Sequence, residues 1–338
     1  MLNSREIEAK LKESIFGQDE LIRVLSITGY KHEMNQIMIA NKKDPINNNI
    51  LICGPTGCGK TYATKILARL IDVPVYEIDC TQLTENGYAG KTKVEKMLDL
   101  VANRLRAGVT HSIIVLDEFD KIYDSYLDIK FNTKGIQEDF LKVLEPNETF
   151  VEIEEHGNRN KVFFNTGGIT FIACGSFEKF KNGMRESSNM MGFGLRSNGV
   201  KKDIKLTQED LINGGFIPEL VGRFSRIINI NPLSEKELTR ILLEGKDSVV
   251  ARYKEMFKFQ GITFEVDKSV MPYLAYRAGN IKTGARALNN VLSEVLDKCI
   301  YDVSSRDDIQ TITLYVENNI IKTGYTVKSS RYQDRKRK

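Results

Sequence analysis

One short segment constrains the fold of this sequence more than any other feature. The pattern G-x-x-x-x-G-K-[ST] is matched by Gly54-Pro55-Thr56-Gly57-Cys58-Gly59-Lys60-Thr61. The segment follows the apolar run Asn49 to Cys53 and opens the helical pattern Tyr62 to Leu70. Glycines let the backbone curl, so that successive N–H groups and the helix N-terminus can surround a phosphate group. The order of strand, glycine-rich loop and helix therefore predicts a phosphate-binding loop, and Cys58 fills a free position of the pattern with a small side chain.

Two residues at the end of this loop carry specific predictions. Lys60 should reach the β- and γ-phosphates of a bound ATP, and the Thr61 hydroxyl should ligate Mg²⁺. A chance glycine-rich turn would not be expected to have a strand before it and a helix after it. The segment therefore predicts a nucleotide site with ATP and Mg²⁺ as cofactors.

Apolar runs elsewhere in the first two thirds of the chain predict a sheet around this loop. Besides Asn49 to Cys53, the runs are Val75 to Asp79, Ser112 to Asp117, Ile169 to Cys174 and Arg226 to Ile230. Several of these runs are followed by a turn and then a helical pattern, which is typical of a parallel sheet covered by helices. Their near-continuous hydrophobicity suits strands that are buried on both faces. The predicted fold class is α/β.

The pattern changes after Pro232, where Ser234 can cap a helix beginning at Glu235. Helical spacing then dominates up to Asp302, with one strand expected at Ile262 to Val266. A chain of 338 residues is long enough for two packed domains. We therefore predict a large nucleotide-binding domain over residues 1–232, a smaller and mainly helical domain over 233–325, and a basic, disordered tail over 326–338.

Composition excludes several classes of protein. Lysine and arginine number 49 against 45 aspartates and glutamates, and a net charge of +4 gives no reason to expect a nucleic-acid partner. No apolar stretch is long enough to span a bilayer, so no membrane association is expected. The five cysteines are scattered without a C-x-x-C pair, so they predict buried thiols rather than a zinc site or a disulfide framework. A reducing, cytoplasmic location is the natural expectation.

Two adjacent acids end one of the predicted strands. Asp117 and Glu118 follow Ser112 to Leu116, which places both carboxylates at the carboxyl edge of the sheet, where ligands bind in open α/β folds. Asp117 is the candidate for holding Mg²⁺ through water. Glu118 is the candidate for orienting and deprotonating the attacking water.

With these residues in place, the chain from about Ser14 to about Val316 resembles the AAA+ protein unfoldases, and among them the ClpX family. The resemblance includes Ile15-Phe16-Gly17-Gln18, Leu70-Ile71-Asp72-Val73-Pro74 and Asp117-Glu118-Phe119-Asp120-Lys121. It implies an ATPase that assembles as a homo-oligomer, a hexameric ring, and acts on unfolded protein substrates. It also implies that Ile15 and Phe16 contact the adenine.

Gly87-Tyr88-Ala89-Gly90 resembles the family's aromatic pore loop, which usually has valine where Ala89 stands. An aromatic ring between glycines on a mobile loop can grip an unfolded chain through nonspecific apolar contact. The competing interpretation is a turn with a packed tyrosine. The order of the motifs favours the pore loop.

The resemblance also assigns residues that respond to the state of the nucleotide. The segment Gly215 to Phe224 is similar to the one that carries the arginine finger, and Arg223 would reach the γ-phosphate held by a neighbouring subunit. Arg226 nearby is given no role, because most surface arginines only form ion pairs. The segment Lys282 to Arg286 is similar to the second sensor, in which Arg286 would touch the phosphates of its own subunit. Ser176, after the strand Ile169 to Cys174, is the candidate first sensor.

A second loop suggests a partner. Met191-Gly192-Phe193 lies in a long polar, glycine-containing stretch and resembles the Ile-Gly-Phe loop with which the family docks on a ClpP-type peptidase. The alternative is a loop pinned to its own domain. No peptidase centre is expected within the chain, because His32, His111 and His156 have no nucleophile partner in motif context.

Other functions stay open at this point. The resemblance includes no N-terminal zinc-binding domain, so no zinc is expected and adaptor binding is in doubt. A stand-alone protein-remodelling chaperone without a peptidase is the second hypothesis. The third is a DNA-acting AAA+ motor, which predicts basic DNA-reading elements that the sequence does not contain outside its tail.

Overall fold

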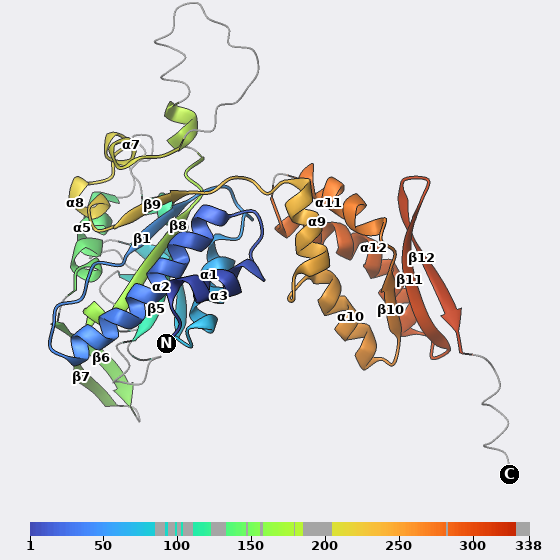
Figure 1. The fold of residues 1–338 in the computed structure, drawn as a ribbon, viewed down its shortest axis with the longest axis horizontal. Coiled ribbons are helices and arrows are strands. Elements are labelled where there is room, and N and C mark those ends of the chain that lie inside the picture. Colours follow the sequence, from blue (N-terminus) through green and yellow to red (C-terminus); the bar gives the residue numbers. More distant parts are fainter. Residues whose placement is uncertain are drawn as a thin grey trace, which may run out of the picture. The chain divides into compact units, whose positions relative to one another are not determined.

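The computed structural model describes residues 1–84, 92–93, 99, 103, 111–122, 133–146, 148–155, 158–178, 180–184, 205–281 and 283–328. The chain forms two compact units (Figure 1). The first unit consists of Met1–Lys12, Gln18–Pro55 and Gly59–Asn231. The second consists of Glu13–Gly17, Thr56–Cys58 and the chain from Pro232 onward.

A parallel five-stranded sheet forms the centre of the first unit, with the strand order β2-β5-β8-β1-β9. Its strands are β1 (Ile50–Cys53), β2 (Val75–Asp79), β5 (Ser112–Asp117), β8 (Ile169–Gly175) and β9 (Arg226–Asn229). Every residue of β1 and β8 is buried, as continuous apolar runs require when a sheet is covered on both faces. The predicted α/β class and parallel sheet are confirmed.

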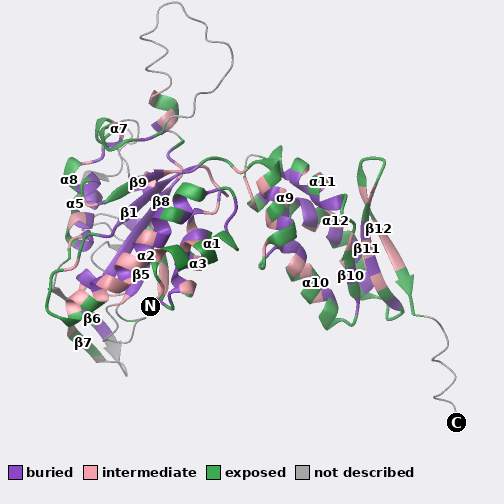
Figure 2. Ribbon diagram, viewed as in Figure 1, coloured by how far each residue is buried: buried purple, intermediate pink, exposed green. Residues whose placement is uncertain are grey.

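Helices cover both faces of this sheet. Successive side chains of a strand point to opposite sides, so neighbouring residues of one strand contact helices on different faces. In β8, Thr170 contacts His32 of α2 (Asp19–Ala40), whereas Phe171 packs in a hydrophobic cluster with Phe140 of α5 (Thr133–Leu144). The helices α1 (Ser4–Lys12) and α3 (Lys60–Leu70) pack with α2. Figure 2 shows the buried strands between these helices.

Shorter elements complete the first unit. The hairpin of β6 (Glu148–Glu155) and β7 (Asn158–Asn165) is antiparallel, and β3 (Leu83–Thr84) pairs with β4 (Thr92–Lys93) in parallel. The remaining short helices are η1 (Cys80–Gln82), η2 (Phe119–Ile122), η3 (Thr166–Gly168), α7 (Gln208–Asn213) and α8 (Pro218–Val221). Three of them adjoin strands of the central sheet: η1 follows β2, η2 follows β5 and η3 precedes β8.

The second unit is built from helices and a small sheet around its own core. The helices are α9 (Glu235–Glu244), α10 (Val249–Phe259), α11 (Val270–Gly279) and α12 (Arg286–Ser304). Ser234 caps α9 as predicted: its side chain accepts a hydrogen bond from the backbone N–H of Glu237, whose carboxylate accepts one from the N–H of Ser234. The core includes the α12 residues Leu288, Val291, Leu292, Leu296 and Cys299.

The small sheet is larger than the sequence interpretation anticipated. Its order is β10-β11-β12, with the predicted strand at β10 (Thr263–Val266) and a hairpin of β11 (Ile309–Glu317) and β12 (Ile320–Val327) that was not foreseen. Asn318 and Asn319 make the turn in the left-handed region, with φ of 52° and 57°. Alternating apolar residues around two asparagines were the available signal. Among the described residues, no helix combines the length and hydrophobicity needed to span a lipid bilayer.

Candidate nucleotide site

The glycine-rich loop joins β1 to α3 and begins at the carboxyl edge of the sheet. The Gly54 N–H donates to the carbonyl of Gly175 at 3.0 Å, which ties the start of the loop to the end of β8. Gly57 and Gly59 have φ of 76° and 90°, a region that only glycine enters at no steric cost. The motif thus folds as the strand, loop and helix predicted from its sequence.

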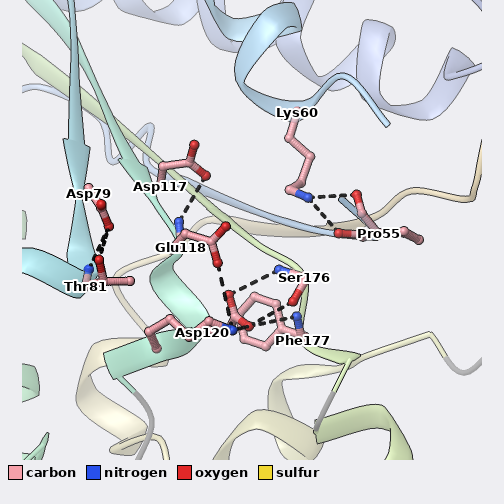
Figure 3. A network of polar contacts seen from close by, with 11 residues as sticks. Pro55, Lys60, Asp79, Thr81, Asp117, Glu118, Asp120, Ser176 and Phe177 are labelled. Carbon is pink, nitrogen blue, oxygen red and sulfur yellow. Dashed lines mark hydrogen bonds and ion pairs between the residues drawn. The ribbon is translucent and has the colours of Figure 1, made fainter. Parts of the chain in front are cut away.

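Lys60 lies over this loop. Its Nζ donates to the carbonyls of Gly54 at 2.7 Å and Pro55 at 2.9 Å (Figure 3). The residue is buried even though it carries a charge. A buried ammonium group needs such partners, and its position beside the loop is the one that a phosphate-binding lysine requires.

The two predicted Mg²⁺ ligands are in contact. The Thr61 hydroxyl, in the first turn of α3, donates to Asp117 Oδ2 at 3.1 Å. Asp117 ends β5, which also places it opposite Asp79 in the ladder between β2 and β5. A hydroxyl and a carboxylate are oxygen ligands of the kind that Mg²⁺ prefers. The described side chains therefore fit the ion.

Glu118 follows Asp117 in a strained conformation. Its φ is 53°, which is uncommon for a residue with a side chain, and its N–H donates to Asp117 Oδ1 at 3.0 Å. Its side chain is 42% exposed, and its Oε2 lies 3.8 Å from Lys121 Nζ. Such exposure leaves the carboxylate accessible to water, which a general base for hydrolysis requires.

Another acid at the same edge caps a short helix. Asp79, at the end of β2, accepts hydrogen bonds from the hydroxyl and the N–H of Thr81 and thereby caps η1. The Thr81 hydroxyl is the main cause of a lowered pKa of Asp79. The carboxyl edge therefore contains a capping acid, Asp79, in addition to Asp117 and Glu118 of the candidate site.

Ser176, the candidate first sensor, lies next to an acid that the sequence interpretation gave no role. Asp120 accepts hydrogen bonds from the N–H and the hydroxyl of Ser176 at 3.1 and 3.0 Å, and from the N–H of Phe177 at 3.2 Å (Figure 3). Asp120 belongs to η2, directly after Glu118 and Phe119. The signal in the sequence was only the acid two places beyond Glu118.

Arg223 lies at the opposite, amino edge of the same sheet. The Asn47 side chain donates to the Arg223 carbonyl at 3.0 Å, and both the N–H and the hydroxyl of Ser225 donate to the carbonyl of Asn49, just before β1. Gly54 follows β1, so about 13 Å of strand separates the two ends. The structure therefore does not bring Arg223 to the phosphate loop of its own subunit.

The Arg223 side chain has a partner that the sequence did not reveal. It forms an ion pair with Glu145, the residue that follows α5. Its Nε is buried and has no hydrogen-bond partner among the residues that the structure describes. The two side chains are 37% and 45% exposed, so the pair lies at the surface.

Other predicted residues belong to the second unit. Ile15 and Phe16 are buried, and the Arg240 guanidinium lies 4.7 Å from the centre of the Phe16 ring. Arg286 is exposed at the first position of α12. Just before it, the Ala285 N–H donates to the carbonyl of Gly57, which is part of the same unit, at 2.9 Å.

Two predicted loops fall outside the described residues. They are the pore-loop segment Gly87, Tyr88, Ala89 and Gly90, and the docking segment Met191, Gly192 and Phe193. Lys282 of the second-sensor segment is outside them as well. These assignments stay predictions.

Two of the three histidines, the buried His32 and the half-buried His111, form a stacked pair at the amino edge. The rings of His32 and His111 stack with their centres 4.7 Å apart, and His32 Nδ1 lies 2.9 Å from the Thr170 hydroxyl. Burial lowers the pKa of His32 to about 3, and the neighbouring His111 adds to this effect. Both contacts lie at the end of the sheet remote from the phosphate loop.

Comparison with known proteins connects these features. Residues 46–227 match the family model of the AAA domain (Cdc48 subfamily), and residues 233–315 match the C-terminal, D2-small domain of ClpB protein. The first match covers the phosphate loop and nearly all of the central sheet, and the second covers most of the second unit.

Similar whole proteins extend the likeness over nearly the full chain. Proteins named ATP-dependent Clp protease ATP-binding subunit ClpX are 30% identical in Borrelia duttonii and 31% identical in Treponema denticola, and ClpX 2 of Wolinella succinogenes is 29% identical. The alignments cover 94%, 89% and 92% of this chain and 78%, 77% and 80% of those proteins, in the same order.

Proposed function

Because the chain belongs to the ClpX family of AAA+ ATPases, we propose that it assembles into a hexameric ring that unfolds substrate polypeptides and threads them into a separate ClpP-type peptidase. As a Clp-type AAA+ unfoldase, the chain binds and hydrolyses ATP. One observation carries the assignment of the site: Lys60, the Thr61–Asp117 contact and Glu118 lie together at the carboxyl edge of one sheet.

Phosphate binding falls to the loop and to Lys60. The backbone N–H groups from Thr56 to Thr61, which include the start of α3, suit the β-phosphate, and the Lys60 ammonium suits the β- and γ-phosphates. Thr61 and Asp117 would hold Mg²⁺, Asp117 through water, and the ion when bound neutralises phosphate charge. Ile15 and Phe16 are the proposed adenine contacts.

Glu118 is the proposed general base. It orients a water molecule for attack on the γ-phosphorus and accepts the proton that this water loses. The left-handed backbone at Glu118 supports this role, because non-glycine residues in such conformations cluster at functional sites. Ser176, at the end of the neighbouring strand β8, is the proposed first sensor.

Arg223 is proposed to act on the nucleotide of the neighbouring subunit. It projects from the edge opposite to its own phosphate loop, so only a second copy can bring a γ-phosphate to it. A guanidinium placed there stabilises the charge that develops on the transferred phosphoryl group. In a closed ring in which the carboxyl edge of each subunit meets the amino edge of the next, every nucleotide receives an Arg223 from a neighbour. Arg286 is the proposed second sensor, which reports the nucleotide state to the second unit.

Substrate gripping is assigned to Tyr88 within Gly87-Tyr88-Ala89-Gly90, and peptidase docking to Met191, Gly192 and Phe193. Both assignments rest on likeness to the family. We also propose a cytoplasmic location, the reducing environment in which the five buried cysteines would stay thiols.

Unfolding of a fluorescent protein with an unstructured tail tests the proposal. The chain with ATP should extinguish the fluorescence, and addition of a ClpP-type peptidase should produce fragments. Tyr88→Ala should abolish unfolding but keep basal ATPase activity, because it removes a ring and no nucleotide contact. Tyr301→Ala, which truncates a tyrosine that is 79% exposed on α12, is the matched control. Unfolding at the wild-type rate by Tyr88→Ala contradicts the pore-loop assignment.

The peptidase partner is tested separately. Phe193→Ala should keep ATPase and unfolding activity while losing degradation, because several weak docking loops on one ring act together. Phe259→Ala, at a phenylalanine that is 86% exposed at the end of α10, is the control. If Phe193→Ala still supports degradation at the wild-type rate, the docking assignment is wrong. If the unmodified chain unfolds the substrate but never associates with such a peptidase, a stand-alone remodelling chaperone is the better description.

A further inference from the structure

We propose that Asp120 is a positioning residue for ATP hydrolysis, which holds Ser176 and the turn after β8 against the end of β5. The inference rests on the proposed function of this edge, in which Glu118 activates water and Ser176 senses the nucleotide. In this proposal Asp120 touches neither the attacking water nor the nucleotide. It acts through its hydrogen bonds to Ser176 and Phe177 (Figure 3).

The Asp120 carboxylate suits this position because both of its oxygens accept hydrogen bonds. Oδ1 accepts from the N–H of Ser176, and Oδ2 accepts from the Ser176 hydroxyl and from the N–H of Phe177. Oδ2 also lies 3.1 Å from Lys121 Nζ, and the Asp120 side chain is only 9% exposed. An uncharged amide has a single acceptor oxygen and cannot serve the donors on both sides.

The backbone around this contact is built to allow a close approach. A Cβ at Gly175 would lie 2.7 Å from Asp120 Oδ1 and 2.6 Å from the Phe177 ring, so glycine is required at the end of β8. Phe177 itself has a φ of 53° and a buried ring that contacts Phe180 and Phe216. A left-handed non-glycine residue persists only where its surroundings hold it. The hydrogen bond to Asp120 and the aromatic contacts of the ring together hold Phe177 in this conformation.

The location of Asp120 explains what it positions. It stands two residues after Glu118, which is also left-handed, and its partners lie 56 and 57 residues further along the chain at the end of the neighbouring strand. One carboxylate thereby joins the turn that contains the proposed base to the turn that contains the proposed sensor. Misplacement of a reacting group by about 1 Å can reduce turnover by about 100-fold.

Asp120→Asn tests the inference. It should lower kcat for ATP hydrolysis by roughly 10- to 100-fold while KM and the affinity for ATP change by less than about threefold, because the phosphate loop is untouched. Asp210→Asn is the matched control, since Asp210 also accepts hydrogen bonds from an N–H and a hydroxyl, both of Thr207. This control should keep kcat within about twofold of wild type.

A double-mutant cycle with Ser176→Ala separates positioning from general destabilisation. Ser176→Ala removes one of the three hydrogen bonds and should lower kcat less than Asp120→Asn does. The double variant should lose no more than about twofold beyond Asp120→Asn, because both changes break the same connection. Should Asp120→Asn fail to fold, Asp120→Glu replaces it, because this variant keeps the charge but displaces the carboxylate, and the inference requires it to lower kcat at unchanged ATP affinity.

Two results would overturn the inference. One is a wild-type kcat in Asp120→Asn, and the other is additive losses in the double variant. Glu118→Gln measured alongside distinguishes failure of this inference from failure of the proposed function. If Glu118→Gln is inactive while Asp120→Asn is normal, only the positioning role is wrong; if Glu118→Gln is itself fully active, the assignment of the whole edge is wrong.

Discussion

The two edges of the central sheet are made of different chemistry, although the same strands end at both. At the carboxyl edge, charged side chains meet backbone in left-handed conformations, as at Glu118 and Phe177. At the amino edge, side-chain amides bind backbone groups in the interior: Asn49 donates to the Leu144 carbonyl and accepts from the Phe171 N–H. Strain and partial exposure mark the edge to which we assign the chemistry, and hydrogen-bonded, buried amides mark the edge that holds the strands together.

Arg223 is the exception at the amino edge, and its removal should have the largest effect. Arg223→Ala should lower ATPase activity on the order of 10³-fold, because a finger stabilises the transition state directly. Arg226→Ala, three residues on at an exposed position of the same edge, should stay near wild type. Steady-state ATPase assays over a range of subunit concentrations check this.

Mixing experiments decide whether Arg223 acts between subunits. Inactive Lys60→Ala and Arg223→Ala chains should regain some activity together, because an intact phosphate loop on one chain can meet an intact arginine on the other. An ATPase that is independent of concentration, or mixtures that stay inactive, would argue that the amino edge is purely structural.

At the carboxyl edge, Glu118→Gln should reduce turnover by about 100-fold while ATP still binds. Lys60→Ala should instead lose ATP binding, because the ammonium is the proposed phosphate contact and is given no part in activating water. Binding of a fluorescent ATP analogue together with phosphate release separates the two outcomes. Near-normal hydrolysis by Glu118→Gln would remove the functional contrast between the edges.

The stacked histidine pair predicts a pH dependence that belongs to the amino edge, where His32 is the buried member. The pKa of His32 is about 3 in the folded chain and should return to about 6.5 on unfolding, so its contribution is fully present above pH 6.5 and declines as the pH falls toward 3. The free energy of unfolding should drop by about 1 kcal/mol between about pH 7 and about pH 5.5 from this group alone. His32 is enclosed by the His111 ring, the Thr170 hydroxyl and the elements that carry them.

Chemical denaturation of wild type and His32→Gln at several pH values measures this contribution. The variant should have a lower stability at neutral pH but a flatter pH profile, with a residual slope from His111, whose pKa is also lowered by burial. Identical slopes for the two proteins would show that His32 does not control the acid sensitivity.

The smallest effect is expected for the ion pair at the amino edge. Glu145→Gln should change the free energy of unfolding by less than about 1 kcal/mol, because both side chains of the pair are more than one third exposed and water screens them. Its ATPase activity should fall far less than that of Arg223→Ala. A loss as large as that of Arg223→Ala would make Glu145 part of the finger rather than a surface partner.

The sequence predicted the carboxyl edge better than the amino edge, for a physical reason. Lys60, Thr61, Asp117 and Glu118 belong to contiguous patterns in which strand, turn and polar residue succeed one another, so their meeting at one edge follows from parallel pairing. The Asp120–Ser176 and Arg223–Glu145 contacts join residues 56 and 78 positions apart, and no local pattern encodes such pairs. The hairpin of β11 and β12 was missed although its alternation and its Asn318–Asn319 turn are local signals.

The Lys60 ammonium, held by the carbonyls of Gly54 and Pro55, makes nucleotide uptake an exchange of partners rather than a simple addition. An incoming β-phosphate has to replace two existing hydrogen bonds with stronger, charge-assisted ones. The measured affinity is then the difference between the new bonds and the old. A nucleotide without a β-phosphate has no group to replace these two carbonyls as acceptors for Lys60. The loop should therefore discriminate by the number of phosphate groups as well as by their charge.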